Sequence, residues 1–351
     1  MNWFLFPFAL IFRLIVDIRN QLFNLGILKS TSFNKAIISI GNITVGGTGK
    51  TPHTEYIINL LEEYYSLATL SRGYKRKSKG FFEAKTSSKI SEVGDEPLQI
   101  KNKFPQITVA VDEKRVNGVN QLLKKEKAPQ VILLDDAFQH RHITPGLNIL
   151  LIDYNRLITK DHMLPMGRLR EPSHNCSRAN IIIVTKCPKG MQPIDFRLMQ
   201  KELNLFPYQE LYFTSFKYKK LIAVFSQSTG KEISELKDYT VMVVTGIAYP
   251  KPLYTELKQA GVKVVKQEFV DHHAFSPSDV HKITERFMQI NEQKKLIICT
   301  EKDAIRFKEM AEYQDFVKLP IFYLPIDVEF LNQGDESFKT ALSKYISHYQ
   351  N

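Results

Sequence analysis

SIGNITVGGTGKTP, the stretch from Ser39 to Pro52, has the order of a strand end, a glycine-rich loop and the first turn of a helix. Such a loop binds phosphate because glycines let backbone N–H groups turn towards the anion, and the helix adds its positive N-terminal end. Lys50 would reach the β- and γ-phosphates of a nucleotide, and the Thr51 hydroxyl would bind Mg²⁺. The residues expected to surround the phosphates are Thr44, Val45, Gly46, Gly47, Thr48, Gly49, Lys50 and Thr51.

One position departs from the general phosphate-loop pattern G-x-x-x-x-G-K-[ST], which has glycine where this chain has Thr44. The Gly-Lys-Thr end of the pattern is intact and follows an apolar run at 36–40. The alternative interpretation is a glycine-rich strand–helix turn with an incidental lysine.

Apolar, strand-like runs alternate with helical segments through the first two-thirds of the chain. Such runs, separated by helices, predict a mostly parallel sheet with helices on both faces, whose ligands bind at the carboxyl ends of the strands. We therefore predict an α/β fold of the P-loop NTPase type, with a second, smaller α/β domain joined by a strand linker. The predicted strands lie near 36–40, 67–71, 107–111, 130–134, 148–152, 181–185 and 211–216, and near 240–245, 263–266 and 296–300 in the second domain.

A strand-prone segment rich in Lys and Tyr, near 206–221, is the expected boundary between the two domains. The last strand-like segment, 321–330, could pair with 211–216 as a two-stranded bridge. The predicted organisation is an apolar helix at 1–28, a P-loop core at 29–208, a linker strand at 209–220, a second α/β domain at 221–320, and a return strand with a C-terminal helix at 321–351.

The composition is that of a globular protein, with 43% hydrophobic and 24% charged residues. The formal net charge of +11 suits nucleic acid, an anionic membrane face or a phosphorylated substrate. There is no long run of like charge and no RNP-type motif, so we do not expect nucleic acid as a partner. The three cysteines offer no disulfide framework and no CxxC pair, which fits a reducing compartment.

The segment Trp3–Phe12 is apolar throughout, and Arg13 and Asp17 then interrupt it. That run is too short for a transmembrane helix, which needs about 20 apolar residues. Without positive charge before it or small residues after it, it is also unlike a signal peptide. We predict a helix in the membrane interface, with Arg13, Arg19 and Lys29 near lipid headgroups. The alternative is a helix docked on the protein's own core.

Two carboxylates end an apolar strand at Val131–Asp136, the arrangement of a Walker B strand. Asp135 or Asp136 would then lie near Thr51 and hold Mg²⁺ directly or through water. Gln139 and His140 follow at once and could contact phosphate or metal-bound water, although a hydrogen-bonded turn histidine is an equal alternative for His140.

Asp95 is a candidate for the carboxylate that accepts a proton from an attacking hydroxyl. Its position before Glu96 and Pro97 equally suits a helix cap. Asp271-His272-His273 could be catalytic or a polar loop, since a histidine beside a carboxylate tunes its pKa. Arginine-bearing strings at 71–75 and 167–172, and the string 300–303, suit anion recognition or surface salt bridges.

Together these strings resemble the tetraacyldisaccharide 4′-kinase (lipid A 4′-kinase) family of Gram-negative bacteria, in which threonine at position 44 is the usual residue. The resemblance rests on GNITVGGTGKTP at 41–52, SRGY at 71–74, GDEP at 94–97, DDAFQH at 135–140, LREP at 169–172, TGIA at 245–248, DH at 271–272 and TEKD at 300–303. Two departures are Ala137, where the family commonly has glycine, and Tyr249-Pro250, where Asn-Pro is usual.

The resemblance implies transfer of phosphate from ATP·Mg²⁺ to the 4′-hydroxyl of a lipid disaccharide 1-phosphate, at the cytoplasmic face of the inner membrane. No obligate protein partner is evident from the sequence. It implies Asp95 as the base, assisted by His272, with Lys50 at the triphosphate. Thr51, Asp135, Asp136 and Glu171 are implied at the metal, and Arg72, Arg115, Gln139, His140 and Arg170 are candidates for contacting the lipid substrate.

Two other functions fit parts of the sequence. A membrane-cycling regulatory ATPase would carry a signature lysine where this chain has Val45, and its membrane helix is usually C-terminal. A soluble small-molecule kinase with a similar core would not need Trp3–Phe12 to be exposed. Dependence of activity on detergent or liposomes separates these alternatives.

Overall fold

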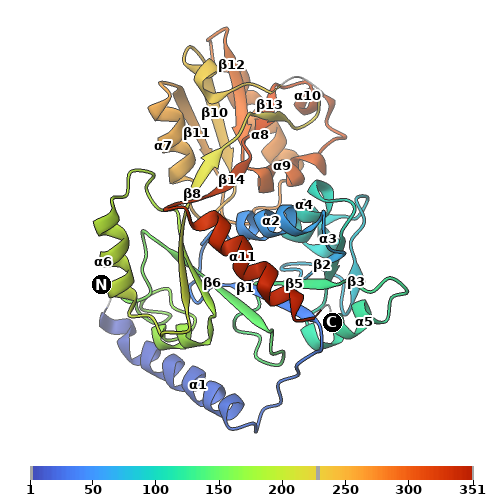
Figure 1. The fold of residues 1–351 in the computed structure, drawn as a ribbon. Coiled ribbons are helices and arrows are strands. Elements are labelled where there is room, and N and C mark those ends of the chain that lie inside the picture. Colours follow the sequence, from blue (N-terminus) through green and yellow to red (C-terminus); the bar gives the residue numbers. More distant parts are fainter. Residues whose placement is uncertain (1–2, 227–229, 350–351) are drawn as a thin grey trace. The chain divides into compact units, whose positions relative to one another are not determined.

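A computed structural model describes residues 3–226 and 230–349, which divide into two compact units (Figure 1). The predicted N-terminal and C-terminal segments also include residues 1–2 and 350–351, which lie outside the described residues. The first unit comprises Met1–Val93, Ile100–Phe216 and Val328–Asn351, and the second comprises Gly94–Gln99 and Lys217–Asp327.

A mostly parallel sheet organises the first unit, in the order β14-β8-β7-β6-β1-β5-β2-β4-β3. The strands from β8 to β4 along this order pair in parallel, and β3 pairs with β4 in the antiparallel sense. Their bounds are β1 Ala36–Gly41, β2 Leu67–Ser71, β3 Phe82–Glu83, β4 Thr108–Val111, β5 Val131–Asp135, β6 Leu147–Asp153, β7 Ile181–Thr185, β8 Glu210–Tyr218 and β14 Ile326–Phe330.

Strand β1 lies between β5 and β6, and every one of its residues is buried. Ile40 pairs with Asp135, so the loop that follows β1 begins beside the carboxylate end of β5. A side chain at Gly41 would place its Cβ 2.7 Å from the Cβ of Phe138, which only glycine avoids. The register and this close contact together fix where the glycine-rich loop leaves the sheet.

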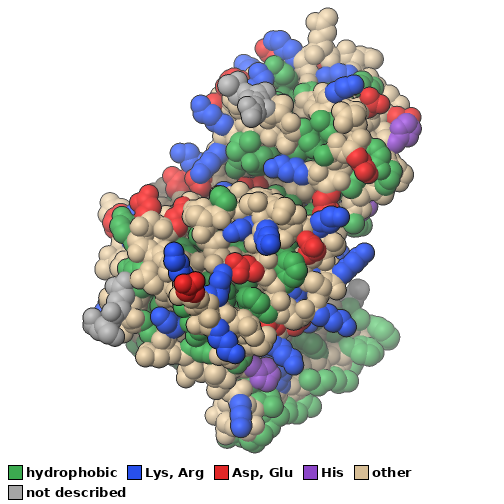
Figure 2. Space-filling model, turned by 90° about the vertical axis from the view of Figure 1, so that its right-hand side faces the viewer, with side chains coloured by type: hydrophobic (Ala, Val, Ile, Leu, Met, Phe, Trp, Pro, Cys, Tyr) green, Lys and Arg blue, Asp and Glu red, His purple; other side chains and the backbone are tan. Residues whose placement is uncertain are grey.

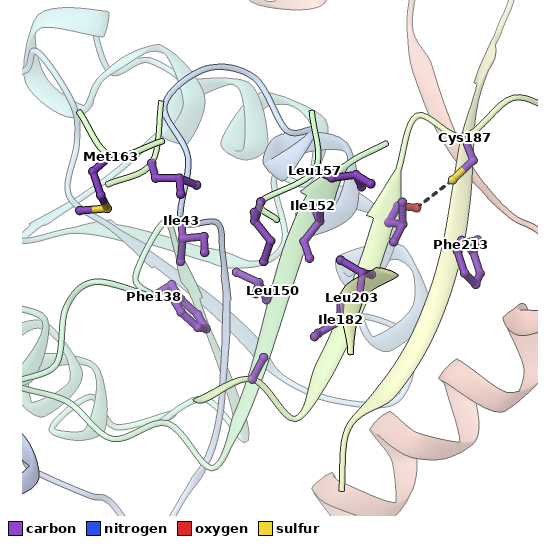
Figure 3. Packing of buried hydrophobic residues seen from close by; sticks show 14 of the residues in the cluster. Ile43, Phe138, Leu150, Ile152, Leu157, Met163, Ile182, Cys187, Leu203 and Phe213 are labelled. Carbon is purple, nitrogen blue, oxygen red and sulfur yellow. Dashed lines mark hydrogen bonds between the residues drawn. The ribbon is translucent and has the colours of Figure 1, made fainter. Parts of the chain in front are cut away.

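A large apolar cluster supports this edge of the sheet. Figure 3 shows Leu150, Ile152 and Ile182 projecting from adjacent strands into it, and Ile43 joins them from the glycine-rich loop. Burying each such side chain contributes about 1.5–3 kcal/mol relative to exposure. The loop is therefore anchored at its start by apolar packing as well as by the strand.

Helices cover the sheet of the first unit. Helix α2 begins directly after the glycine-rich loop, and α11 crosses the sheet beside it, where Tyr56 and Phe338 meet with ring centroids 6.2 Å apart (Figure 1). The Tyr345 hydroxyl of α11 donates to the Ile37 carbonyl of β1 at 3.0 Å. The helix bounds are α1 Phe6–Asn24, α2 Lys50–Leu61, α3 Ile90–Val93, α4 Asp95–Lys103, α5 Arg115–Leu123, α6 Pro193–Leu203 and α11 Gly334–Ser347, with short 3-10 turns at Trp3–Leu5 and Ser173–Arg178.

Helix α1 has one buried side and one solvent-exposed apolar side. Ala9, Asn20 and Phe23 are buried, and Phe12 and Val16 pack against the cluster of the first unit. Figure 2 shows hydrophobic side chains gathered at the lower right of that view. Among the described residues, no helix is both long and apolar enough to cross a membrane. The exposed apolar side chains of the helix are Phe4, Phe6, Phe8, Leu10, Ile11, Leu14, Ile15 and Ile18, the first of these in the preceding 3-10 turn.

The second unit has a smaller sheet in the order β11-β10-β12-β13-β9, in which only β9 pairs in the antiparallel sense among the described residues. The second unit also includes Gly94–Gln99, which are Gly94 and the first five residues of α4. Its strands are β9 Ile222–Ala223, β10 Thr240–Thr245, β11 Lys263–Glu268, β12 Lys295–Cys299 and β13 Ile321–Tyr323, and its helices are α7 Lys251–Gln259, α8 Pro277–Met288, α9 Glu301–Lys308 and α10 Gln314–Val317, with a 3-10 turn at Ile233–Leu236.

The predicted fold class, a mostly parallel α/β fold with a second α/β part, is confirmed. The predicted segment 321–330 divides into two strands, of which β13 joins the second sheet and β14 lies next to β8 in the first. The predicted boundaries at 28, 208, 220 and 320 stay predictions. The division into compact units assigns residues 94–99 to the second unit, and the predicted boundaries assign them to the P-loop core.

Candidate active site

The glycine-rich loop adopts a conformation that its glycines make possible. Gly46 and Gly49 have φ values of 96° and 92°, in the left-handed region that residues with a Cβ rarely adopt. Gly49 is the residue just before α2, and a Cβ there would also lie 2.7 Å from Cζ of Phe216. Because Val45, Gly46 and Gly47 are exposed, the crest of the loop is open to a ligand.

Neighbouring strand ends support the loop from below. The Asn42 side chain donates to Thr48 Oγ1 at 2.8 Å, and Thr185 Oγ1 donates to the Thr48 carbonyl at 2.8 Å. Lys186 donates to the Gly47 carbonyl and pairs with Asp153 at 2.7 Å. These contacts hold the loop in shape without filling its open side.

A second segment of chain braces the start of the loop. The Val45 N–H donates to the Arg168 carbonyl and the Arg170 N–H donates to the Ile43 carbonyl, each at 2.8 Å. Thr44 forms an isolated antiparallel bridge with Leu169. The threonine that departs from the general pattern is thus part of a short β-bridge, and it is buried.

Lys50, Asp136 and Arg170 meet at the mouth of the loop. Lys50 Nζ lies 3.6 Å from Asp136 Oδ1, and Arg170 Nη2 lies 3.0 Å from the same oxygen. Burial would raise the pKa of Asp136, but Lys50, Arg170 and Arg115 outweigh it and lower that pKa to about 2. Asp136 is therefore ionised at neutral pH, and its φ of 47° lies in the left-handed region, directly after the end of β5.

Asp135 and Thr51 are the other candidate metal ligands near the loop. Asp135 is buried at the end of β5 and accepts a hydrogen bond from Thr54 Oγ1 at 3.4 Å, and Thr51 is buried in the first turn of α2. No three His, Cys, Asp or Glu side chains of the described chain are arranged to hold a metal ion. One hydroxyl and one or two carboxylates fit Mg²⁺, which keeps several waters and uses substrate phosphates as further ligands.

Glu171 has a different environment from the other predicted metal ligands. Its Oε2 accepts hydrogen bonds from Asn175 at 2.9 Å and from Arg178, and Asn20 of α1 lies 3.5 Å away. The carboxyl group is 1% exposed. In this structure Glu171 links the 3-10 turn at 173–178 to α1.

The candidate substrate residues form a positively charged region beside Asp136. Arg115 is buried and donates to the Asp112 carbonyl at 2.9 Å, and burial lowers its pKa to about 10 although Asp136 and Asp135 oppose that shift. Arg72 is exposed and lies close enough to lower the pKa of Arg115 further. Arg115 and Arg72 thus share an electrostatic environment with Asp136.

His140 and Gln139 border the same region. Burial lowers the pKa of His140 to about 4, and the positive charges of Arg115, Arg19 and Arg72 lower it too. Its imidazole is therefore neutral at pH 7. The Gln139 side chain donates to the Asn42 carbonyl at 2.7 Å, so it supports the start of the loop.

The second unit contains a separate cluster around Asp95, the first residue of α4. His272 Nδ1 lies 2.9 Å from Asp95 Oδ2, and Arg306 pairs with the same oxygen. Arg306 also pairs with the buried Asp303 at 2.9 Å, and the Gly246 N–H donates to Asp303 at 3.1 Å. A chain of charges therefore runs from α9 to the start of α4.

Asp95 is a strongly stabilised carboxylate. Burial would raise its pKa, but the hydrogen bond from His272 and the charges of Lys302 and Arg306 hold that pKa well below its usual range. Its Oδ1 accepts from the Glu96 N–H at 2.9 Å, so one side chain contacts both the helix start and the charged cluster. The family resemblance implies Asp95 and His272 as a pair, and in the structure their side chains are in contact.

Several residues with a role in these clusters were not predicted. Lys186 and Asp153 lie at the ends of two predicted strands, so the rule that ligands bind at strand ends could have found both. Arg306 lies one helical turn after the string at 300–303. His53 and Thr214 carry no sequence signal, because their contact depends on the meeting of α2 and β8.

Comparison with known proteins gives one consistent family. The family model described as tetraacyldisaccharide-1-P 4′-kinase matches residues 1–347. The tetraacyldisaccharide 4′-kinase of Phocaeicola vulgatus is 47% identical over 349 residues, which is 99% of this chain and 95% of that one. That of Flavobacterium johnsoniae is 44% identical over 342 residues, covering 97% of this chain and 96% of that one.

A solved structure shows the same relationship in three dimensions. The apo-form LpxK of Aquifex aeolicus, described as a complex with ATP, superimposes with a TM-score of 0.75 at 28% identity. The match covers 97% of this chain and 98% of that one.

Proposed function

The chain belongs to the tetraacyldisaccharide-1-P 4′-kinase family and is an ATP-dependent kinase of lipid A biosynthesis, and we propose how its residues divide the work. The observation that carries the proposal is the meeting of Lys50, Asp136 and Arg170 at the open mouth of a glycine-rich loop. A lysine, a carboxylate and the backbone N–H groups of a glycine-rich loop at one strand end are what a nucleoside triphosphate site requires.

In the proposed site, the β- and γ-phosphates of ATP occupy the crest of the loop, where Lys50 exchanges its contact with Asp136 for phosphate oxygens. Thr51, Asp136 and Asp135 would hold Mg²⁺, which neutralises charge on the phosphates when bound. Arg170 keeps Asp136 ionised and in place, since it pairs with that carboxylate and also donates to the Asn42 carbonyl at 3.1 Å.

We propose that Asp95 accepts the proton of the attacking 4′-hydroxyl. Phosphoryl transfer proceeds through a loose transition state, so the acceptor carboxylate needs correct position and charge more than high basicity. The low pKa of Asp95 keeps it ionised throughout the working pH range. His272 and Arg306 hold the carboxylate in one orientation, and Asp303 balances the charge of Arg306.

For the 1-phosphate of the lipid we favour the pair Arg72 and Arg115 over Arg170. Arg170 is already engaged by Asp136 and by Asn42. Arg72 is exposed, and its charge adds to that of Arg115 in the region beside His140. An anion there would relieve the mutual repulsion of the two arginines.

The solvent-exposed apolar side of α1 supports attachment to a membrane surface. Ile11, Leu14 and Ile15 are 57%, 60% and 58% exposed, although the opposite side of the helix packs on the protein. Such a helix lies in the interface with its apolar face among acyl chains. We propose that α1 holds the enzyme at the cytoplasmic face of the inner membrane, where a lipid substrate is met and basic residues favour anionic lipids.

Incubation with γ-labelled ATP, Mg²⁺ and a lipid disaccharide 1-phosphate in mixed micelles, followed by chromatography of the lipid, tests the reaction. Label should appear in the lipid and should depend on both Mg²⁺ and Lys50. Release of labelled inorganic phosphate without labelled lipid would instead favour the regulatory ATPase.

A further inference from the structure

His53 is a buried histidine of α2 that the proposed reaction does not use. Its side chain is 1% exposed. Nδ1 lies 2.7 Å from the carbonyl oxygen of Gly49 at the end of the phosphate loop, and Nε2 lies 2.9 Å from Thr214 Oγ1 in β8. The imidazole thus spans the space between the loop and a strand distant in sequence.

The chemistry of the two partners fixes the protonation of the ring. A carbonyl oxygen only accepts, so Nδ1 must carry the hydrogen and donate it to Gly49. The ring is 1% exposed, and the two atoms that its nitrogens contact, a carbonyl oxygen and a hydroxyl oxygen, carry no charge, so the neutral ring with a lone pair on Nε2 is favoured. The Thr214 hydroxyl has two acceptors within reach, Nε2 at 2.9 Å and the Val184 carbonyl at 3.5 Å, and it donates to the nearer Nε2. The hydrogen bonds then run in one direction, from Thr214 through His53 to Gly49.

The carbonyl of Gly49 matters because its peptide group also contains the N–H of Lys50. In a planar trans peptide, the C=O and the N–H point in opposite directions. Holding the Gly49 oxygen on the His53 side therefore holds the Lys50 N–H on the opposite side. The backbone N–H of His53 donates to the same oxygen at 3.2 Å, so this one residue contributes both hydrogen bonds.

Strand β8 contacts the end of the loop at a second point. Phe216 lies two residues after Thr214, on the same face of the strand, and its Cζ would be 2.7 Å from a Cβ at Gly49. Its ring centroid lies 6.1 Å from that of His53. Gly49 is thus held between His53 and Phe216, in a conformation that few other residues can adopt.

We propose that His53 is a positioning residue for nucleotide binding: its Nδ1–H form, set by Thr214, orients the Gly49–Lys50 peptide so that the Lys50 N–H faces the phosphates. This inference rests on the proposed nucleotide site at the loop. It assigns to Thr214, a residue of β8 outside the loop and outside α2, a measurable influence on ATP binding.

Substitution of Thr214 tests the inference without altering the loop. Thr214→Val removes the donor to Nε2 and leaves a buried nitrogen unpaired, so the KM and Kd for ATP should rise about tenfold. The KM for the lipid and the kcat should change less than twofold. Thr214→Ser keeps the hydroxyl and should restore the ATP affinity. His53→Leu should match or exceed the effect of Thr214→Val.

Tyr56→Phe is the matched control, because it removes a hydrogen bond between the same helix and Asp335, away from the loop. An increase in the KM for ATP in Tyr56→Phe equal to that in Thr214→Val would overturn the inference, since any loosening of α2 would then suffice. A wild-type KM in Thr214→Val would overturn it as well.

Nitrogen-15 NMR of protein labelled at histidine measures the tautomer of His53 directly. The His53 spectrum should show a protonated Nδ1 and an unprotonated Nε2 at pH 7, and the opposite tautomer would contradict the proposal. Lys50→Ala distinguishes failure of the proposed nucleotide site from failure of the proposed role of His53. Unchanged ATP affinity in that variant would remove the nucleotide site itself, whereas weakened affinity with a wild-type Thr214→Val would remove only the role of His53.

Discussion

His272 Nδ1 lies 2.9 Å from Asp95 Oδ2, although 177 residues separate the two in the sequence. The contact forms because Asp95 begins α4 and His272 follows β11, and both belong to the second compact unit. Arg306 completes the arrangement from α9. Asp95 is thus held as a carboxylate by two side-chain donors, His272 and Arg306, besides the Glu96 N–H, and this determines what its substitution should do.

Asp95→Asn should lower kcat by about 10²- to 10⁴-fold, the usual contribution of a general base, and leave the Kd for ATP within about twofold. Asp279→Asn is the matched control, because Asp279 forms a similar carboxylate–histidine pair with His273 at 3.0 Å in the same unit. Steady-state kinetics and nucleotide titration measure both effects. A near-normal kcat for Asp95→Asn would exclude Asp95 as the base.

Arg306→Met should shift the acid limb of the pH–rate profile upwards. Arg306 and His272 stabilise the charged form of Asp95, so removing the guanidinium raises the pKa of Asp95 towards its ordinary value. The carboxylate would then be protonated, and kcat/KM lost, at a higher pH than in the wild type. Arg306→Lys keeps the charge and should stay closer to the wild-type profile. Superimposable profiles for the wild type and Arg306→Met would contradict this coupling.

Lys50→Ala should raise the KM for ATP and lower kcat together, because Lys50 contacts phosphate in both the ground state and the transition state. We expect at least a tenfold loss in each, measured at saturating lipid. Lys189→Ala, which removes an exposed lysine 3.9 Å from Glu329 in the same unit, is the control and should behave as wild type. Equal effects of the two variants would mean that only net charge matters.

Acid should destabilise the wild-type protein more than His53→Leu. The pKa of His53 is about 4 in the folded protein and about 6.5 in the unfolded chain, so the unfolded state binds the extra proton between these values. Its stabilising contribution is complete above pH 6.5 and is lost as the pH falls towards 4. Between pH 7 and 5 the wild type should lose about 2 kcal/mol more unfolding free energy than the variant. Thermal unfolding at the two pH values measures this, and parallel losses would argue against a buried neutral His53.

Leu14→Ser with Ile15→Ser should reduce flotation with anionic liposomes. Both side chains are more than half exposed, so the change removes membrane contact without opening the core. Ile194→Ser with Leu198→Ser on α6 is the matched control, since those side chains are 57% and 58% exposed on another helix. If the α6 substitutions lower flotation as much as the α1 substitutions, membrane binding is not a specific property of α1.

The sequence predicts the sheet well because buried parallel strands are recognisable as short apolar runs. Strands β1, β5 and β7 are fully buried and mostly apolar, and β1 ends in glycine and β5 in aspartate at the candidate site. The sequence predicts Asp135 or Asp136 near Thr51 because an apolar strand that ends in carboxylates accompanies a phosphate loop, and in the structure β5 lies next to β1.

Contacts made by single side chains across long distances could not be predicted in the same way. Nothing near Glu171 in the sequence indicates that Arg178 and Asn20 surround its carboxyl group. Arg306 pairs with Asp95 only because α9 presents it one turn after Asp303. Such partners depend on how helices are oriented over a sheet, and the pattern of residues along the chain does not specify that orientation.

The position of β1 between β5 and β6 also has a consequence for the folding of the protein as it is synthesised. Ala36 pairs with Val131 and Ile38 with Leu147, so both neighbours of the strand that carries the phosphate loop are made much later than the strand itself. Pairings between such distant segments form slowly. A growing chain that stops before Val131 would contain every residue of the loop and still have no scaffold to present it. The capacity to bind ATP should therefore arise late in translation, once the ribosome has released β8, whose Thr214 and Phe216 contact the end of the loop region.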